Sequence, residues 1–241
     1  MIKKLIPPFL LFCFFSFAQE KLPFIDFQEL SKLAAESSQS GDYDKTLAIF
    51  NKVNKNDSAY CSVMISKSYY LMALKKYDEA IDMADKGIKK NCGDLRASFY
   101  INKGVALLNQ KKYVEATEVF DEGITNYPKN NIFWYNKGVT LESQGEIEEA
   151  VKAYQTSIIL NPFYRKAYLQ LGNICYKQEL VSQALMCFNM YILLEPDAEN
   201  AFSILNSLDN ILKNKNENSK NPSLIISKDD EAFEEIDLVI N

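Results

Sequence analysis

The chain has 241 residues, of which 47% are hydrophobic and 24% are charged, and its formal net charge is -5. These proportions are those of a folded protein and exclude wholesale disorder. The chain has no histidine, which excludes a His-based catalytic triad, a histidine general base and a His-rich zinc site. Its 8 glycines are too few for the many tight turns of all-β folds, and its acidic balance provides no basic field for nucleic acid.

The first 18 residues have the pattern of a secretory signal peptide. Lys3 and Lys4 form a positive start, and residues 5–17 are apolar apart from two prolines and one serine. Ser16 and Ala18 place small residues at the two sites that a signal peptidase reads. We therefore expect cleavage after residue 18 and an exported mature chain, periplasmic or extracellular in a bacterium.

Two other interpretations of this segment remain open. A membrane anchor is one, although the apolar run is shorter than the ~20 residues of a span and contains Pro7 and Pro8. A lipoprotein anchored through Cys13 is the other, although Phe12 stands where a small residue belongs. No later segment is long and apolar enough to cross a bilayer, and residues 19–26 are expected to form a short lead.

A period of 34 residues runs through the middle of the chain. Four residue classes recur at this interval: Gly104, Gly138 and Gly172; Ala116, Ala150 and Ala184; Phe120, Tyr154 and Phe188; and Pro128, Pro162 and Pro196. This spacing resembles the tetratricopeptide repeat (TPR) family, whose repeats place Leu-Gly in a first helix and then Ala, an aromatic residue and a closing Pro in a second. The resemblance implies five repeats, at residues 27–60, 61–96, 97–130, 131–164 and 165–198.

The chemistry of the recurring residues agrees with this resemblance. Glycine lets two helices approach closely, the aromatic residue fills the space between them, and proline ends the second helix. Each unit reads as two amphipathic segments of about 13 residues that cannot bury their apolar faces alone. The expected fold is all-α, a right-handed α-solenoid of about five TPR helix pairs with a C-terminal closing helix.

The C-terminal part of the chain differs from the repeats. Residues 199–213 have helical apolar spacing and are expected to form the closing helix, residues 214–226 form a polar linker, and residues 227–241 form an acidic tail. One helical face of the tail is apolar, with Ala232, Phe233, Ile236, Val239 and Ile240. This tail either docks on the solenoid or binds a partner. A sequence that stops within this predicted helix is also consistent with a truncated reading frame.

No catalytic motif accompanies the repeats. The sequence has no P-loop, dinucleotide fingerprint, nucleophile elbow or calcium loop, and its carboxylate clusters are expected on solvated helix surfaces. Without histidine and without a C-x2-C pair, a metal site is disfavoured. We predict no catalytic residues, no cofactor and no metal; a glycan or peptidoglycan hydrolase is disfavoured.

The cysteines divide into two sets. Cys61 and Cys92 fall at the first and thirty-second sites of one repeat, which are neighbouring ends of an antiparallel helix pair, so an oxidising compartment favours a disulfide between them. Cys175 and Cys187 fall at sites expected to face the interior and are predicted to be buried free thiols.

In TPR proteins the first helix of each repeat lines the concave face. A site number is a position counted from the first residue of a repeat. The resemblance places the protein-binding face at sites 5, 6, 9 and 12, which predicts the residues Ile65, Tyr69, Met72, Ile101, Asn102, Val105, Leu108, Tyr135, Asn136, Val139, Leu169, Asn173 and Tyr176. The two asparagines at site 6, Asn102 and Asn136, are expected to hold a peptide backbone. The charged clamp of some TPR co-chaperones is absent, and Lys67, Lys103 and Lys137 replace the usual leucine at site 7, with their ammonium groups expected in water.

The sequence therefore predicts a non-catalytic scaffold that binds a peptide or protein on the concave TPR face in an exported compartment. The alternative is a structural or assembly subunit of a cell-envelope complex, engaged through the convex face or the acidic C-terminal tail. No nucleic-acid partner is expected.

Overall fold

The structure is a computed structural model that describes residues 27–90, 92–197, 201–204 and 206. Within these ranges the chain is helical and contains no strand. The helices are α1 (Phe27–Gln39), α2 (Tyr43–Phe50), α3 (Tyr60–Ala73), α4 (Tyr77–Lys89), η1 (Gly93–Leu95), α5 (Arg96–Asn109), α6 (Tyr113–Asn126), α7 (Asn131–Gln144), α8 (Ile147–Leu160), α9 (Arg165–Lys177) and α10 (Val181–Leu194).

Several predicted segments fall wholly or partly outside the described residues. These are the signal peptide 1–18, the lead 19–26, the linker 214–226 and the tail 227–241. Of the predicted closing helix, residues 201–204 and 206 are described and helical.

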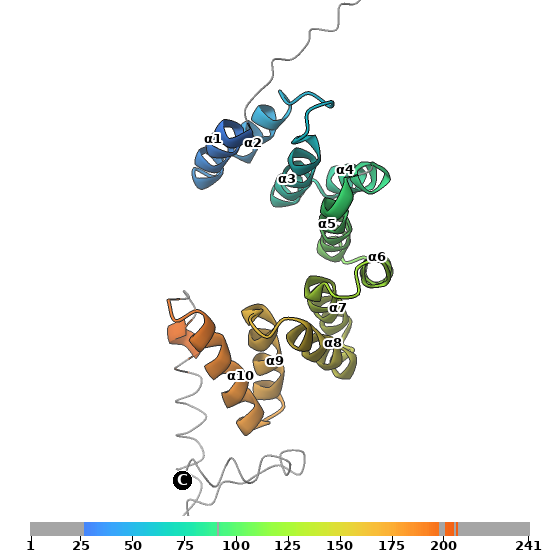
Figure 1. The fold of residues 1–241 in the computed structure, drawn as a ribbon. Coiled ribbons are helices and arrows are strands. Elements are labelled where there is room, and N and C mark those ends of the chain that lie inside the picture. Colours follow the sequence, from blue (N-terminus) through green and yellow to red (C-terminus); the bar gives the residue numbers. More distant parts are fainter. Residues whose placement is uncertain (1–26, 91, 198–200, 205, 207–241) are drawn as a thin grey trace, which may run out of the picture.

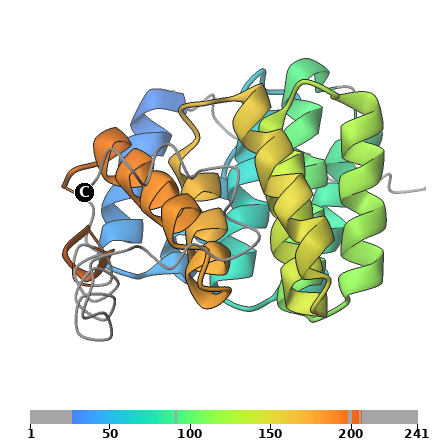
Figure 2. The same ribbon diagram turned by 90° about the horizontal axis from the view of Figure 1, so that it is seen from below.

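The helices form five successive antiparallel pairs that stack into an arc (Figure 1). Each helix packs on the next one along the chain, and the first helices of neighbouring pairs also meet, α3 with α5 and α5 with α7. Figure 2 views the same stack from below, with α10 in front and α1 behind it at the far end of the curve. The predicted all-α solenoid is confirmed.

Glycine and aromatic residues set the distance between the two helices of a pair. A Cβ atom added at Gly104 would lie 2.4 Å from Phe120 Cε1, and one added at Gly138 would lie 2.7 Å from Tyr154 Cε1. Phe120 and Tyr154 are fully buried. The space that a side chain would need at each glycine is therefore already filled by an aromatic ring of the second helix.

A second set of glycines packs one pair on the next. A Cβ atom at Gly87 would lie 2.3 Å from Phe99 Cδ1, and one at Gly123 would lie 2.2 Å from Phe133 Cε1. In both cases the glycine is in the second helix of one pair and the ring is in the first helix of the following pair. These contacts hold α4 against α5 and α6 against α7, as the stacking of a solenoid requires.

Helix α2 is shorter than expected. It has 8 residues, whereas the other second helices have 13 or 14. The prediction of about 13 residues was wrong here, because Asn54 Oδ1 accepts a hydrogen bond from the Asn56 N–H, and Asp57 Oδ1 accepts one from the Ala59 N–H. These local hydrogen bonds offer the backbone an alternative to helix after Phe50.

Candidate protein-binding face

The first helices of the pairs form the inner wall of the arc, and the second helices form its outer wall (Figure 1). The predicted binding residues all belong to α3, α5, α7 and α9. The solenoid therefore brings four separate segments of the chain, each of which carries predicted binding residues, to the inner side of one arc. Such a surface is preformed, because each helix is fixed by its neighbours in the stack.

Two tyrosines are the exposed members of the predicted set. Tyr69 in α3 is 58% exposed, and Tyr176 in α9 is 43% exposed. The remaining apolar members pack against the core clusters with one side and stay partly exposed on the other: Ile65, Met72, Ile101, Val105, Leu108, Tyr135, Val139 and Leu169. The inner wall is thus a largely apolar surface with a protruding tyrosine toward either end.

The side-chain amides of the two asparagines at site 6 make hydrogen bonds inside the array. Asn102 Nδ2 donates to the Ile65 carbonyl oxygen at 3.1 Å, and so joins α5 to α3. Asn136 Nδ2 donates to the Ile132 carbonyl oxygen at 2.8 Å, one turn earlier in α7. Asn173, the third asparagine of the predicted face, is half-buried on α9.

A polar network interrupts the apolar wall between the fourth and fifth pairs. Tyr154 Oη donates a hydrogen bond to Glu142 Oε2 at 2.8 Å, and Lys177 Nζ lies 3.9 Å from Glu142 Oε1. The Tyr135 ring meets the Tyr164 ring edge-on, with centroids 5.2 Å apart. The charge of Glu142 is therefore held by partners on α8 and α9.

The tyrosines of this network remain protonated at neutral pH. Burial, reinforced by the neighbouring Glu142 charge, raises the pKa of Tyr154 far above its usual value. Burial also raises the pKa of Tyr164 to about 12. Their hydroxyl groups can therefore act as hydrogen-bond donors, and they add no charge to the inner wall.

Two of the three lysines at site 7, Lys103 and Lys137, connect successive repeats through ion pairs. Lys103 Nζ lies 2.8 Å from Asp85 Oδ1, and Lys137 Nζ lies 2.6 Å from Asp121 Oδ1. The two lysine side chains are only 27% and 23% exposed, so the prediction of ammonium groups in water missed their carboxylate partners. The signal was present in the sequence, since Asp85 and Asp121 share one site of the repeat and lie 18 and 16 residues before their lysine partners.

The cysteines are also placed by the structure. Cys61 and Cys92 are joined by a disulfide, with Cα atoms 5.9 Å apart. The bond ties the start of α3 to the segment that follows α4. Neither Cys175 nor Cys187 forms a disulfide within the described residues; Cys175 is buried, whereas Cys187 is only half-buried. Burial raises the pKa of Cys187 to about 12, which keeps it in the unreactive thiol form.

The described part of the chain provides neither a cluster of metal ligands nor a membrane-spanning helix. In that part of the chain, no three cysteine or carboxylate side chains are grouped closely enough to hold a metal ion. None of the helices in the same ranges combines the length and apolar character that a bilayer span needs.

Comparison with known proteins identifies the repeat. Two family models, both described as tetratricopeptide repeat, match residues 66–131 and residues 132–164. None of the curated proteins compared with the chain matches it.

Solved structures share the fold. A thermophilic TPR protein of Thermus thermophilus, TTC0263, is 14% identical with a TM-score of 0.63, covering 76% of this chain and 99% of its own. A tetratricopeptide repeat protein of Parabacteroides merdae ATCC 43184 is 21% identical with a TM-score of 0.53, covering 65% and 62%. MamA of Desulfovibrio magneticus RS-1, from residue 41 to its end, is 21% identical with a TM-score of 0.51, covering 71% and 96%. At this identity the likeness concerns the fold alone. The family models, the 34-residue period and the stacked helix pairs together show that residues 66–164 consist of tetratricopeptide repeats, and the same helix-pair fold extends over α1 to α10.

Proposed function

We propose that the inner wall of the array binds an apolar segment of a protein partner in an exported compartment. The observation that carries the proposal is the pair Tyr69 and Tyr176, which are large side chains left exposed on helices whose other predicted binding residues are partly buried and mostly apolar. Tyrosine is enriched among the residues that dominate binding energy, because it contributes a large rigid surface and a polar tip.

The chemistry of the wall limits the kind of segment that it suits. Sites 5, 9 and 12 of the second to fifth pairs carry one charged residue, Glu142, and that residue is engaged with Tyr154 and Lys177. A partner that depends on a terminal carboxylate would find no basic side chain at these sites, and a basic side chain of a partner would find only Glu142, which already interacts with Tyr154 and Lys177. An uncharged segment with aliphatic or aromatic side chains at regular intervals fits this wall, and the preformed stack reduces the entropy lost on binding.

Two observations support export. The first is the signal pattern of residues 1–18. The second is the Cys61–Cys92 disulfide, a bond that persists in oxidising compartments and is rare in the reducing cytosol. We expect the chain purified from the periplasmic or secreted fraction to begin at Gln19, and an intact mass that still includes residues 1–18 would contradict export by this signal.

Partner capture with variants of the inner wall tests the binding proposal. Tyr69→Arg combined with Tyr176→Arg should lower capture from a cell-envelope extract by about tenfold or more, because two exposed anchor side chains are replaced by charges. Helicity measured by circular dichroism should be unchanged, since both positions are exposed.

Val114→Arg is the matched control. Val114 is 65% exposed on α6, a helix of the outer wall, so the variant places one positive charge, half the charge added by the double variant, at a comparably exposed apolar position. Capture should be unaffected by Val114→Arg. Equal capture by the double variant and the wild type, or a loss with Val114→Arg alone, would contradict binding on the inner wall.

A further inference from the structure

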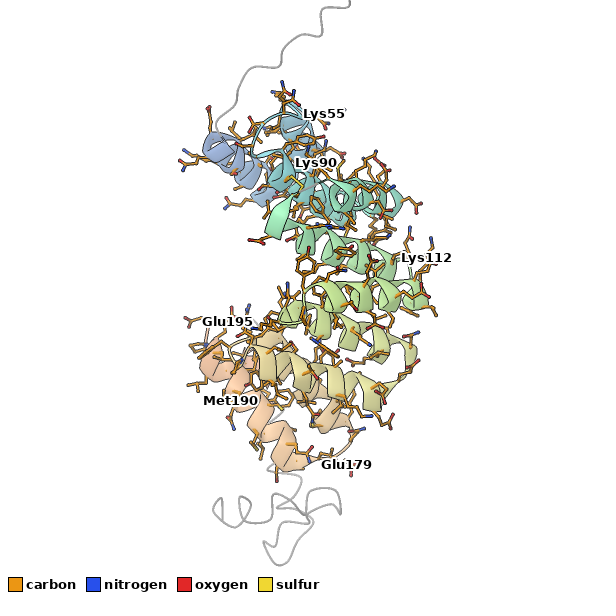
Figure 3. The ribbon with its side chains drawn as sticks, turned by 45° about the vertical axis from the view of Figure 1, so that its right-hand side comes forward. Lys55, Lys90, Lys112, Glu179, Met190 and Glu195 are labelled. Atoms are coloured by element: carbon orange, nitrogen blue, oxygen red, sulfur yellow. A yellow bond between two sulfur atoms is a disulfide. The ribbon has the colours of Figure 1, made fainter. Side chains whose placement is uncertain are left out.

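The turns of the array lie along two opposite edges. Because the two helices of each pair are antiparallel, the turns between successive pairs lie along one edge, and the turns inside the pairs lie along the other (Figure 2). Figure 3 shows the two edges at α10, where Glu195 follows the end of the helix and Glu179 precedes its start. We call the edge with the turns between pairs, where Glu195 lies, the inter-pair edge.

The inter-pair edge is predominantly basic. Its turns, together with one helical turn on either side of each, carry Lys52, Lys55, Lys86, Lys89, Lys90, Arg96, Lys129, Arg165 and Lys166, against Asp57, Asp94, Glu195 and Asp197. Lys86 forms an ion pair with Asp82, and Arg165 forms one with Glu195. The other basic side chains of this edge are exposed, and within the described ranges none of them forms an ion pair.

The opposite edge is predominantly acidic. Counted in the same way, it carries Glu36, Asp42, Asp44, Asp78, Glu79, Glu115, Glu142, Glu146, Glu148, Glu149 and Glu179, against Lys45, Lys75, Lys76, Lys111, Lys112 and Lys177. The charge of the array is therefore separated between its two edges, which gives the molecule a preferred orientation in front of a charged surface.

The inter-pair edge also exposes apolar side chains over the last two pairs. Ile159 is 77% exposed in the last turn of α8, Phe163 is 79% exposed in the turn that follows, and Leu193 is 74% exposed in the last turn of α10. Phe202, in the segment after α10, is 75% exposed. No other large hydrophobic side chain of the described residues is as exposed as these. Exposed apolar groups gathered at one place mark a surface that contacts a protein or a membrane.

The basic and apolar side chains follow one another along this edge. Ile159 and Leu193 occupy site 29 of their repeats, the site at which the first two repeats have Lys55 and Lys89. The edge is thus basic over the first three pairs and apolar over the last two, where Lys166 lies three residues from Phe163.

We propose that the inter-pair edge binds the surface of an anionic lipid bilayer. Lysine and arginine side chains are attracted by anionic headgroups, and apolar side chains gain free energy when they enter the boundary between headgroups and acyl chains. The acidic opposite edge is repelled by the same headgroups, so the array approaches with its inter-pair edge toward the lipid.

A lipid surface fits this edge better than a second copy of the chain does. Each of the apolar side chains is at least 74% exposed, so they protrude separately and pack little on one another. A fluid bilayer accommodates separate protruding side chains, whereas a stable protein interface needs a closely packed patch of about 800 Å2 on each partner. Two copies that met through this edge would also bring basic groups together. This proposal does not depend on what the inner wall binds.

Co-sedimentation with lipid vesicles tests the apolar part of the proposal. The chain as isolated from the producing cell should bind vesicles of phosphatidylcholine that contain about one third phosphatidylglycerol, and Ile159→Ser and Phe163→Ser should each weaken this binding about tenfold. Val114→Ser is the matched control and should leave binding unchanged, because Val114 is 65% exposed in the first turn of α6, at the opposite edge.

The same assay tests the charge of the edge. Lys129→Gln with Lys166→Gln should weaken binding to the phosphatidylglycerol vesicles by about tenfold, because two cations near the anionic surface are removed. Lys111→Gln with Lys112→Gln removes the same charge from exposed lysines of the opposite edge and should not weaken binding. Vesicles of pure phosphatidylcholine should bind the wild type more weakly than the mixed vesicles.

The outcomes decide between lipid and the other partners of such a surface. A wild-type chain that does not sediment with the mixed vesicles would overturn the proposal. If analytical ultracentrifugation then shows a dimer that Phe163→Ser dissociates, the edge is an interface between copies of the chain. Equal binding by Phe163→Ser and the wild type, or equal binding of the wild type to vesicles with and without phosphatidylglycerol, would also overturn it.

Discussion

At the scale of single residues, the array depends on sites where a glycine faces an aromatic ring. The 34-residue step of Gly104, Gly138 and Gly172 predicted these close approaches, and the structure places an aromatic ring of the second helix against each of the three. Gly87 and Gly123 also face aromatic rings, in their case rings of the following helix pair. Only these two glycines occupy that position, 36 residues apart, so the sequence shows no period from which the contact could be predicted.

Gly104→Ala tests the packing at one of these sites. The added Cβ atom would lie 2.4 Å from Phe120 Cε1, and the buried ring cannot retreat without moving its neighbours. Overpacking of this kind costs about 1–3 kcal/mol of unfolding free energy. Thermal denaturation should therefore show a midpoint lower by several degrees, at roughly 2–4 °C per kcal/mol for a chain of this size.

The control is a double-mutant cycle with Phe120→Leu. This substitution alone should destabilise the chain, because it leaves a cavity, but it should cost less in the Gly104→Ala background, where the smaller side chain relieves the clash. Additive effects of the two substitutions would contradict the packing explanation.

At the scale of elements, the turn inside each helix pair has the same backbone shape in all five pairs. The residue at this turn has a positive φ whether it is glycine, as at Gly41 (75°) and Gly145 (85°), or not, as at Lys75 (60°), Lys111 (62°) and Glu179 (62°). Residues with a Cβ atom adopt this region at a cost that glycine does not incur. The stacking of the helices thus imposes a turn with positive φ even on residues that disfavour this backbone conformation.

Lys111→Gly should therefore raise the free energy of unfolding by about 0.5–1 kcal/mol, and Gly145→Lys should lower it by about 1 kcal/mol. Urea denaturation measures both. Lys112→Gly is the matched control, since the backbone φ of Lys112 is -85°, and it should destabilise the chain slightly. A Lys111→Gly variant less stable than the wild type would contradict the strain assigned to this turn.

The Cys61–Cys92 disulfide is a second feature of the elements. It closes a loop of sequence separation 31 that contains α3 and α4. A cross-link of that span stabilises by about 3–4 kcal/mol in the chain-entropy model. We expect a reductant to lower the thermal midpoint of the wild type, and the variant Cys61→Ser with Cys92→Ser to show a low midpoint with or without reductant. A wild-type thermal midpoint that the reductant leaves unchanged, together with an intact mass showing both thiols unbonded, would contradict the disulfide.

At the scale of the whole molecule, the fold could be predicted from the sequence, whereas the exposure of individual surface side chains could be predicted only in part. A repeat period reflects contacts that every helix pair must make, which is why the solenoid, with the first helix of each pair on its inner side, follows from the sequence. The length of α2 was not predictable in this way, because hydrogen bonds of Asn54 and Asp57 decide it locally. The degree of exposure was not predictable either: Tyr69 protrudes while Tyr135 packs on Tyr164, a difference set by the neighbours of each helix.

Binding on the inner wall is tested most directly by site-specific photo-cross-linking in the producing cell. A photoreactive phenylalanine analogue at position 69 should form a covalent adduct with a protein partner when illuminated, because Tyr69 is exposed and lies on α3, one of the helices of the inner wall. The same analogue at position 114, on α6, should form none. An adduct from position 114 in the absence of one from position 69 would contradict partner binding on the inner wall and assign it to the outer face.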